Sequence, residues 1–262
     1  MQIVVLTKPV PDPAAAAEKL GSDNRLDRAA SPAVISGNDE YTLEAALRLA
    51  DEHGAEVTLL AMAPPGAVET MRKGLAMGAH RGVLVTDPAL AGSDVTSTVR
   101  VLAAALKTIP FDLVLAGFDT SDGVAGVVGA GIATLLKLPY LSSAAKIEPV
   151  EATESVRVHR ISATGFDVLE AKMPALIVGT QLLGAPRYPS LKGIMGARSK
   201  EIAQRSLADL DLSADEVGGA VARTKVTGKR TPPARGAARV VKGPPDEAAK
   251  EIVALLAERR LV

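Results

Sequence analysis

The stretch FDLVLAGFDTSDGVAGVVGAGIATLLKL, residues 111–138, contains the order of elements that decides the fold. It begins with a continuous apolar run of strand length, FDLVLAG, and ends with the apolar spacing of a helix that we expect to begin near Gly123. A strand whose apolar residues do not alternate with polar ones is typical of a parallel sheet covered on both faces. The stretch therefore predicts a buried strand, a glycine-rich loop and a covering helix.

Alternating strands and helices also precede this stretch. Apolar runs of strand length lie at residues 3–6, 56–63 and 82–86, and helical patterns lie at residues 39–54, 66–79 and 94–109. Strands that alternate with helices in this way form parallel sheets with right-handed crossovers and helices on both faces. The predicted fold class is therefore α/β, with a doubly wound, mostly parallel sheet.

After Pro139 the pattern changes to strand-like pieces without long helices between them. The pieces are AAKIEPV, ESVRVHRIS, FDVLEAK and PALIVGT, at residues 144–150, 154–162, 166–172 and 174–180. The simplest interpretation is a β-rich addition to the same sheet.

The C-terminal part of the chain has a different composition. A polar segment rich in Gly, Pro and Lys begins at about Ser206, and the chain ends in a helix from Glu247 to Arg259. Such a segment cannot form a core alone, so it is either a disordered tail or an arm that lies on a partner. The amphipathic closing helix favours the arm. We therefore divide the chain into an α/β domain, residues 1–205, and a C-terminal arm, residues 206–262.

Composition excludes several classes of function. Among the 262 residues, 30 Lys and Arg balance 30 Asp and Glu, and a net charge of zero does not indicate a nucleic acid partner. Cysteine is absent, and the three histidines, His53, His80 and His159, are scattered, so no metal site is predicted. Any redox chemistry must then belong to a bound cofactor.

The N-terminal sequence MQIVVLTKPVP lacks the basic region of a signal peptide and is interpreted as the first strand. No stretch reaches the roughly 20 apolar residues that are needed to span a bilayer. From these features we expect a cytoplasmic protein that is not embedded in the membrane.

Ligands of doubly wound sheets bind at the carboxyl ends of the strands. Four segments lie there: TKPVPD (7–12), SGNDE (36–40), AMAPPG (61–66) and AGFDTSDGVAG (116–126). In the last one, glycines let the backbone approach a ligand closely, and Ser121 or Asp122 can cap the helix that follows. Backbone amides at a helix start suit a phosphate, although a plain turn of the chain fits the same residues.

The charged residues of these segments have simpler interpretations. Lys8 and Asp12 either bind a ligand or are solvated, and solvation is the favoured interpretation. Asp39 and Glu40 either belong to a site or are ordinary first-turn residues favoured by the helix dipole. No serine lies in a Gly-x-Ser-x-Gly elbow, and no set of nucleophile and base can be assembled. We therefore expect no catalytic residues, and we interpret the three histidines as structural.

A further segment, RYPSLKGIMGARSKE, residues 187–201, predicts a short helix after a proline turn, with Ser190 as a plausible cap. In one interpretation Leu191, Ile194 and Met195 pack inward. In the other, Leu191 is a docking anchor inside a rim formed by Lys192, Arg198 and Lys200.

Five blocks occur in order along the chain and resemble the β subunit of electron transfer flavoproteins. The blocks are DEYTLEAALRL, ETMRKGLAMGAHRGVLV, FDLVLAG followed by TSDGVAG, LEAKMPALIV and APRYPSLKGIMGARSKE. The resemblance covers essentially the whole chain and implies a nucleotide-binding fold like that of adenine nucleotide hydrolases. It also implies a heterodimer in which the α subunit holds the redox-active FAD. The β subunit binds a structural AMP, completes the FAD pocket and packs its C-terminal arm on the α subunit.

The resemblance further implies the direction of electron flow and the residues involved. Electrons enter from acyl-CoA and related dehydrogenases of fatty acid β-oxidation and leave to a membrane quinone oxidoreductase. The implied AMP residues are Leu6, Ser36, Gly37, Asn38, Asp39, Met62, Gly117, Phe118, Asp119, Thr120, Ser121, Asp122, Gly123, Val124, Ala125, Gly126, Val127 and Val128. The implied dehydrogenase-docking residues are Leu191 as the anchor, with Ile194 and Met195 holding the helix to the sheet.

Two alternatives remain open. Val124 and Val127 replace polar residues that are common in the phosphate loop of the family, which leaves room for a flavin-bifurcating variant with a second FAD in place of AMP. The other alternative is a free-standing adenine-nucleotide-binding protein, which would need a Lys or His over the phosphate that the loop does not contain. Gly184 and Ala185 depart from the usual Asn-Glu pair of the family before the docking residues, which leaves the choice of partner open.

Overall fold

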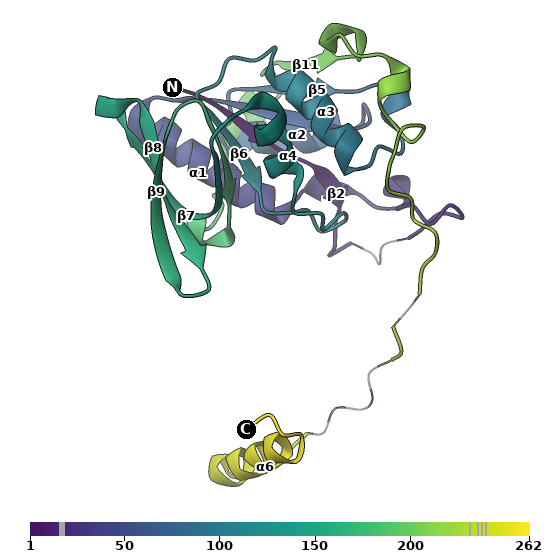
Figure 1. Cartoon of the computed structure of the whole chain (residues 1–262), viewed down its shortest axis with the longest axis vertical. Helices are drawn as coiled ribbons and strands as arrows, with labels where there is room; N and C mark the ends of the chain where they lie inside the picture. The colour runs from purple at the N-terminus through teal and green to yellow at the C-terminus, as the bar shows by residue number, and fades with distance from the viewer. Residues whose placement is uncertain (16–18, 231, 235, 237, 239) are drawn as a thin grey trace. The chain divides into compact units, whose positions relative to one another are not determined.

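The computed structural model describes residues 1–262 apart from 16–18, 231, 235, 237 and 239. The chain forms two units, Met1–Thr227 and Gly228–Val262. The first unit contains the sheet and its covering helices (Figure 1). Within the described residues, no helix combines the length and apolar content needed to cross a membrane.

The sheet has nine strands in the order β11-β5-β4-β1-β6-β10-β7-β8-β9. The strands are β1 (Gln2–Leu6), β4 (Glu56–Met62), β5 (Arg81–Val85), β6 (Leu113–Gly117), β7 (Tyr140–Val150), β8 (Ser155–Ser162), β9 (Gly165–Lys172), β10 (Ala175–Gly179) and β11 (Ile202–Arg205). The pairs from β11 to β7 are parallel, and β8 and β9 are antiparallel. A separate antiparallel pair joins β2 (Pro9–Pro11) to β3 (Ala33–Ile35). The predicted doubly wound, mostly parallel sheet with a β-rich addition is confirmed.

One strand of the predicted addition lies in the middle of the sheet. The segment PALIVGT forms β10, which pairs in parallel with β6 on one side and β7 on the other. All five residues of β10 are buried. A strand covered on both faces has a continuous apolar run, and this is why its sequence looks like those of β1 and β6.

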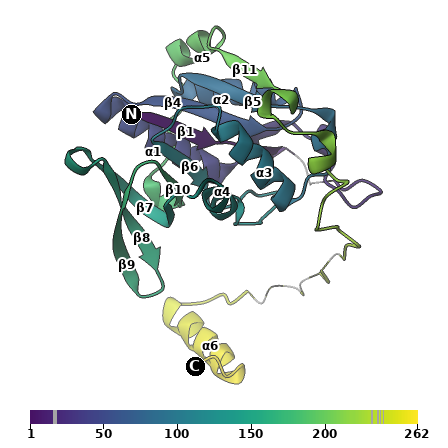
Figure 2. The same ribbon diagram turned by 45° about the horizontal axis from the view of Figure 1, so that its top comes forward.

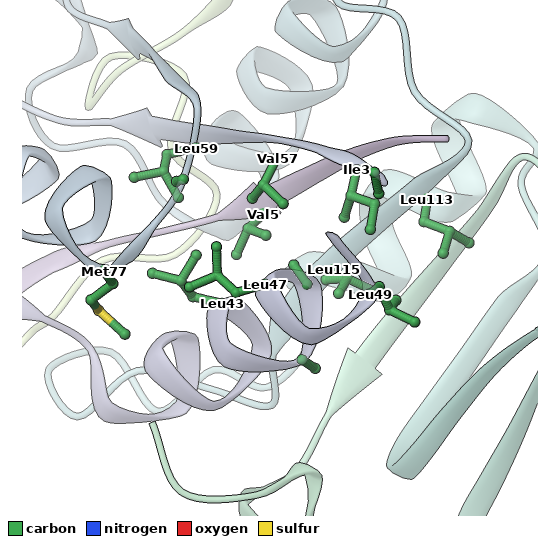
Figure 3. Close-up of a cluster of buried hydrophobic side chains, with 14 of the residues drawn as sticks. Ile3, Val5, Leu43, Leu47, Leu49, Val57, Leu59, Met77, Leu113 and Leu115 are labelled. Atoms are coloured by element: carbon green, nitrogen blue, oxygen red, sulfur yellow. The ribbon is translucent and has the colours of Figure 1, made fainter. Parts of the chain in front are cut away.

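Helices cover both faces of the sheet. The helices α1 (Gly37–His53), α2 (Ala67–Met77) and α5 (Leu191–Ala197) pack on one face, and α3 (Val95–Leu106) and α4 (Val128–Leu136) on the other. Alternate residues of β1 point to opposite faces of the sheet. Ile3 and Val5 pack in the apolar core on the α1 side, and Val4 and Leu6 pack in the apolar core on the α3 side. Figure 3 shows Val5 of this first layer together with Leu43 and Leu47 of α1, and Figure 2 shows α3 and α4.

The starts of two helices differ from the prediction. Helix α1 begins at Gly37 after the N-cap Ser36 and stops at Gly54, which adopts the left-handed conformation with φ 64°. Helix α4 begins at Val128 and not near Gly123. Val124 and Gly126 have φ values of 43° and 65°, so the backbone leaves the helical region before α4 starts. The predicted cap by Ser121 or Asp122 is therefore wrong.

The compact unit extends beyond the predicted boundary at residues 205 and 206. Leu207, Leu210 and Val217 are buried in the apolar layer under α3. The backbone N–H of Gly218 also donates to the hydroxyl of Ser97 in α3, at 2.8 Å. These long-range contacts attach the two short 3-10 helices of this segment, Ala208–Leu210 and Ala214–Glu216, to the sheet unit. The polar composition on which the boundary was based does not reveal them.

The second unit consists of an extended segment and helix α6 (Pro245–Glu258). In the described part of the chain, no residue of α6 is buried. Ile252 and Val253 are each more than half exposed. The apolar residues of α6 therefore have no core within this unit.

Candidate functional site

The sheet has a topological switch point between β1 and β6. From β1 the chain proceeds to β4 and then β5 on one side, while β6 lies on the other side of β1. Connections that diverge from neighbouring strands leave a crevice at the carboxyl edge, which is where doubly wound sheets bind ligands. Leu6, Met62 and Gly117 are the last residues of β1, β4 and β6, and residues 36–39 begin α1. The structure thus places the predicted nucleotide residues around one edge of the sheet.

Asp39 joins two strand ends under this crevice. It is buried, and its Oδ2 accepts the backbone N–H of Lys8 at 2.8 Å. The backbone N–H of Gly117 also donates to this carboxyl group. Burial raises the pKa of Asp39 to about 7, although both backbone hydrogen bonds and the Lys8 charge act in the opposite direction. Asp39 does lie in the first turn of α1, but it is buried and bonded to two other segments, so the helix dipole is not its main interaction.

Asp122 is held between two cations. Its carboxylate is 1% exposed, and one oxygen accepts from the Lys8 ammonium at 2.9 Å while the other accepts from the Arg28 guanidinium. Burial acts to raise the pKa of Asp122, but the Lys8 charge and the Arg28 hydrogen bond outweigh it and lower the pKa to about 2. The expectation that Lys8 is simply solvated is wrong, because its ammonium group pairs with a loop from another strand.

Asn38 attaches the same loop to the start of α1. Its side-chain amide donates to the Oδ1 of Asp119 at 2.7 Å and to the carbonyl of Asp119 at 3.2 Å. The loop after β6 is therefore held at Gly117, Asp119 and Asp122. Beyond these points it is open: Val124 is 68% exposed and Val127 is 50% exposed.

The start of α4 follows this open part of the loop. Val127 is its N-cap, and no side chain within the described residues caps the helix. The first amides of a helix have no intrahelical acceptor, and their partial positive charge favours an anion. This arrangement is suited to a phosphate.

Two polar residues near this edge, Arg28 and Thr7, are not among the individually predicted site residues. Arg28 lies in the 3-10 helix Arg28–Ala30, and its own segment has no pattern that indicates a partner on the loop after β6. Thr7 directly follows β1, and its buried hydroxyl has no hydrogen-bond partner among the described residues. A groove of about 450 Å³ between α3 and α4 is a separate feature, since of the predicted nucleotide residues it contains only Val127.

The docking segment, which we define as residues 187–200, contains α5. Ser190 caps α5 as predicted and accepts the backbone N–H of Gly193 at 3.0 Å. Leu191, Ile194 and Met195 are 75%, 47% and 66% exposed. The expectation that Ile194 and Met195 hold the helix to the sheet is therefore wrong, and all three apolar side chains are accessible.

Other residues hold α5 in place. Ala197 is buried, and a Cβ on Gly193 would lie 2.3 Å from the carbonyl oxygen of Ala76 in α2, so only glycine allows this approach. Lys200 does not belong to a solvated basic rim, because its ammonium donates to the carbonyls of Leu75 and Ala79 at 2.9 and 2.6 Å. Burial lowers the pKa of Lys200.

No group of three or more potential metal-binding side chains occurs within the described residues. His80 accepts the backbone N–H of Val57 at 3.0 Å, a contact that stabilises the chain between α2 and β5.

The strand order, with its switch point between β1 and β6, defines a doubly wound α/β protein. The electron transfer flavoprotein domain family matches residues 23–210. The electron transfer flavoprotein subunit beta of Clostridium acetobutylicum is 35% identical over 269 residues, which cover 100% of both chains. That of Mycobacterium tuberculosis strain H37Rv is 37% identical over 266 residues, or 99% of each chain. The caffeyl-CoA reductase-Etf complex subunit CarD of Acetobacterium woodii is 35% identical over 268 residues, or 100% of each chain.

The chain belongs to the electron transfer flavoprotein subunit beta family. The resemblance based on the five sequence blocks is confirmed. Membership implies a heterodimer with an α subunit and a role in flavin-related electron transfer.

Proposed function

We propose that this chain binds AMP at the switch point, completes the FAD pocket of its α subunit and docks acyl-CoA-type dehydrogenases. In this role it carries electrons toward a membrane quinone oxidoreductase without catalytic residues of its own. The observation that carries the nucleotide part is the junction of Lys8, Arg28 and Asp122 on the loop that leads to the uncapped start of α4.

The charge of this junction supports a single phosphate group. Two cations face one carboxylate that remains ionised, so these three residues together carry one net positive charge. The unpaired amides of α4 add a partial positive charge. The raised pKa of the buried Asp39 reduces the negative charge at the base of the crevice. An AMP phosphate would satisfy these donors without requiring a metal.

The buried hydroxyl of Thr7 supports a polar ligand at the same edge. A buried hydroxyl without a partner is destabilising by about 1–3 kcal/mol. Thr7 directly follows Leu6, which lies among the expected nucleotide residues. A ribose or adenine group that hydrogen-bonds to this hydroxyl would remove the penalty.

The second unit supports a large interface with the α subunit. Helix α6 has an apolar set at Ile252, Leu255 and Leu256, spaced for one helix face, but no buried residue. An amphipathic helix of this length is marginal alone in water, so its stability must come from packing. We propose that it packs on the α subunit.

The exposed residues of the docking segment support a docking role. Leu191 and Met195 are large apolar side chains on a helix whose end is anchored by other residues. Leucine in a partner pocket and surrounding charges that steer the encounter are typical of a specific but exchangeable contact. Electron transfer requires proximity of the flavin and not an acid or a base from this chain.

The test of the nucleotide assignment is extraction from the purified heterodimer followed by mass analysis. We expect one AMP and one FAD per heterodimer. A Lys8→Met variant should lose AMP and retain FAD, while the surface variant Lys107→Met should retain both. A complex without AMP would contradict the proposal.

Two FAD per heterodimer would instead support a flavin-bifurcating β subunit. The open loop favours keeping this second candidate, because Val124 and Val127 leave their side of the crevice exposed.

A further inference from the structure

A buried carboxylate on α1 holds the entrance of the docking segment. Glu44 is 5% exposed, and its Oε2 accepts from the Nε of Arg187 at 2.8 Å and from the backbone N–H of Arg187 at 3.1 Å. Its Oε1 accepts from the Nη2 of Arg187 at 3.2 Å. Both the side chain and the backbone of Arg187 are therefore fixed by one carboxylate.

The other neighbours of Glu44 extend this arrangement. Arg48, one turn later on α1, donates to the Oε1 of Glu44 at 3.0 Å and to the carbonyl of Leu183 at 3.2 Å. Asp51 accepts from the Nη2 of Arg187 at 2.9 Å. A Cβ on Gly184 would lie 2.5 Å from a guanidinium nitrogen of Arg48, and Gly184 has a φ of 117°. The glycine at this position thus makes room for the Arg48 contact.

The other end of the docking segment is held by α2. The guanidinium of Arg72 donates to the carbonyl of Ala197 at 2.7 Å and also to the carbonyl of Lys200. The Lys200 ammonium in turn donates to two carbonyls at the end of α2. Between these two attachments, Leu191 points away from the protein with three quarters of its surface exposed.

We propose that Glu44 is a positioning residue for partner docking: through Arg187 it holds the docking segment in the conformation that presents Leu191 to the dehydrogenase. This inference rests on the proposed docking function and goes beyond it, because Glu44 does not itself lie on the exposed surface. A segment that is ordered before contact does not lose conformational freedom on binding. The same helix begins at the crevice, so α1 positions both candidate sites.

The test measures reduction of the full heterodimer by butyryl-CoA dehydrogenase in the presence of butyryl-CoA. Glu44→Gln keeps the side-chain volume but places an amide donor against the donors of Arg187. We expect a rise of about 5- to 10-fold in the KM for the heterodimer, with kcat unchanged, since only ordering before contact is lost. The matched control is Glu52→Gln on the same helix, where the carboxylate is exposed and lies near His53.

A double-mutant cycle separates positioning from general destabilisation. Leu191→Ala should raise the KM about 30-fold, the effect of removing an interface anchor of about 2 kcal/mol. In the Leu191→Ala background, Glu44→Gln should add less than about 2-fold, because it acts through the missing side chain. FAD content and reduction by dithionite should remain unchanged in the single variants.

The outcomes distinguish this inference from the function on which it rests. If Leu191→Ala leaves the KM unchanged, the docking function itself fails. If Leu191→Ala raises the KM but Glu44→Gln does not, or if the two effects multiply, the docking function stands and the positioning role of Glu44 is overturned. If Glu44→Gln does not fold, Arg187→Lys replaces it in the same cycle, because lysine keeps the charge and loses the paired contacts.

Discussion

Replacing Gly117 by alanine should disrupt the carboxyl edge of the sheet. A Cβ at this position would lie 2.6 Å from the Oδ1 of Asp39 and 2.8 Å from the carbonyl carbon of Asn38. The first of these atoms belongs to a buried carboxyl group and the second to the backbone of α1, so neither can move without breaking hydrogen bonds. We therefore expect the start of α1 to be pushed away from the end of β6.

The magnitude follows from the contacts that are lost. Overpacking of a close contact costs about 1–3 kcal/mol, and a buried hydrogen bond that is left unmade costs about 1–3 kcal/mol more. We expect Gly117→Ala to lower the free energy of unfolding by about 4 kcal/mol, which corresponds to a Tm lower by about 8–16 °C for a unit of this size. Because Asn38 also holds the loop at Asp119, AMP occupancy should fall as well.

The assay is thermal unfolding of the purified heterodimer, combined with the nucleotide content of each sample. The matched control is Gly66→Ala, since a Cβ on Gly66 would meet no heavy atom of the described residues within 4 Å. We expect that control to change stability by less than about 0.5 kcal/mol. A Gly117→Ala protein that unfolds at the temperature of the Gly66→Ala protein would refute the reasoning.

The remaining predictions concern charged groups of the crevice. The pKa of Asp39 is raised to about 7, so its protonated form is favoured in the folded state. The stability that protonated Asp39 contributes is fully present below about pH 4 and is lost as the pH rises to 7. Relative to Asp39→Asn, the free energy of unfolding of the wild type should therefore fall by up to about 4 kcal/mol over this window, as measured by denaturant titration. The pKa of Asp122 is lowered to about 2, so its contribution is present above about pH 4 and is lost as the pH falls toward 2. The free energy of unfolding of Asp122→Asn should therefore be lower than that of the wild type by about 2 kcal/mol at pH 6 and by much less at pH 2. Equal differences at the two pH values would contradict the ion-pair assignment. Lys8→Met should weaken AMP binding about 10-fold or more by calorimetry, while an unchanged affinity would place the phosphate elsewhere.

The sheet was predictable because its signals are local and periodic. The continuous apolar runs of β1, β4 and β6 follow from burial on both faces, and the glycine that ends α1 follows from its left-handed conformation. The start of α4 was not predictable in the same way. Its apolar pattern extends back to Gly123, but the ion pairs of Asp122 and the turn at Val124 hold that segment out of the helix.

The directions of the side chains in the docking segment could not be predicted from sequence either. Its apolar residues and its cap could be identified from sequence, but their directions could not. Two apolar residues expected to face inward are exposed, and a lysine assigned to the rim around Leu191 donates to the carbonyls of Leu75 and Ala79. A seven-residue helix has too few turns for an apolar face to indicate direction, so close contact at Gly193 decides it.

The sequence by itself determined the class of fold and the family, and it predicted a ligand site at the carboxyl edge of the sheet. These depend on repeated patterns and on the order of elements along the chain. Only the tertiary structure decided that Lys8 and Arg28 meet Asp122, that Asp39 is buried between two strand ends and that Glu44 holds Arg187. These groups lie far apart in sequence, and their charges and pKa values depend on burial and on partners that folding brings together.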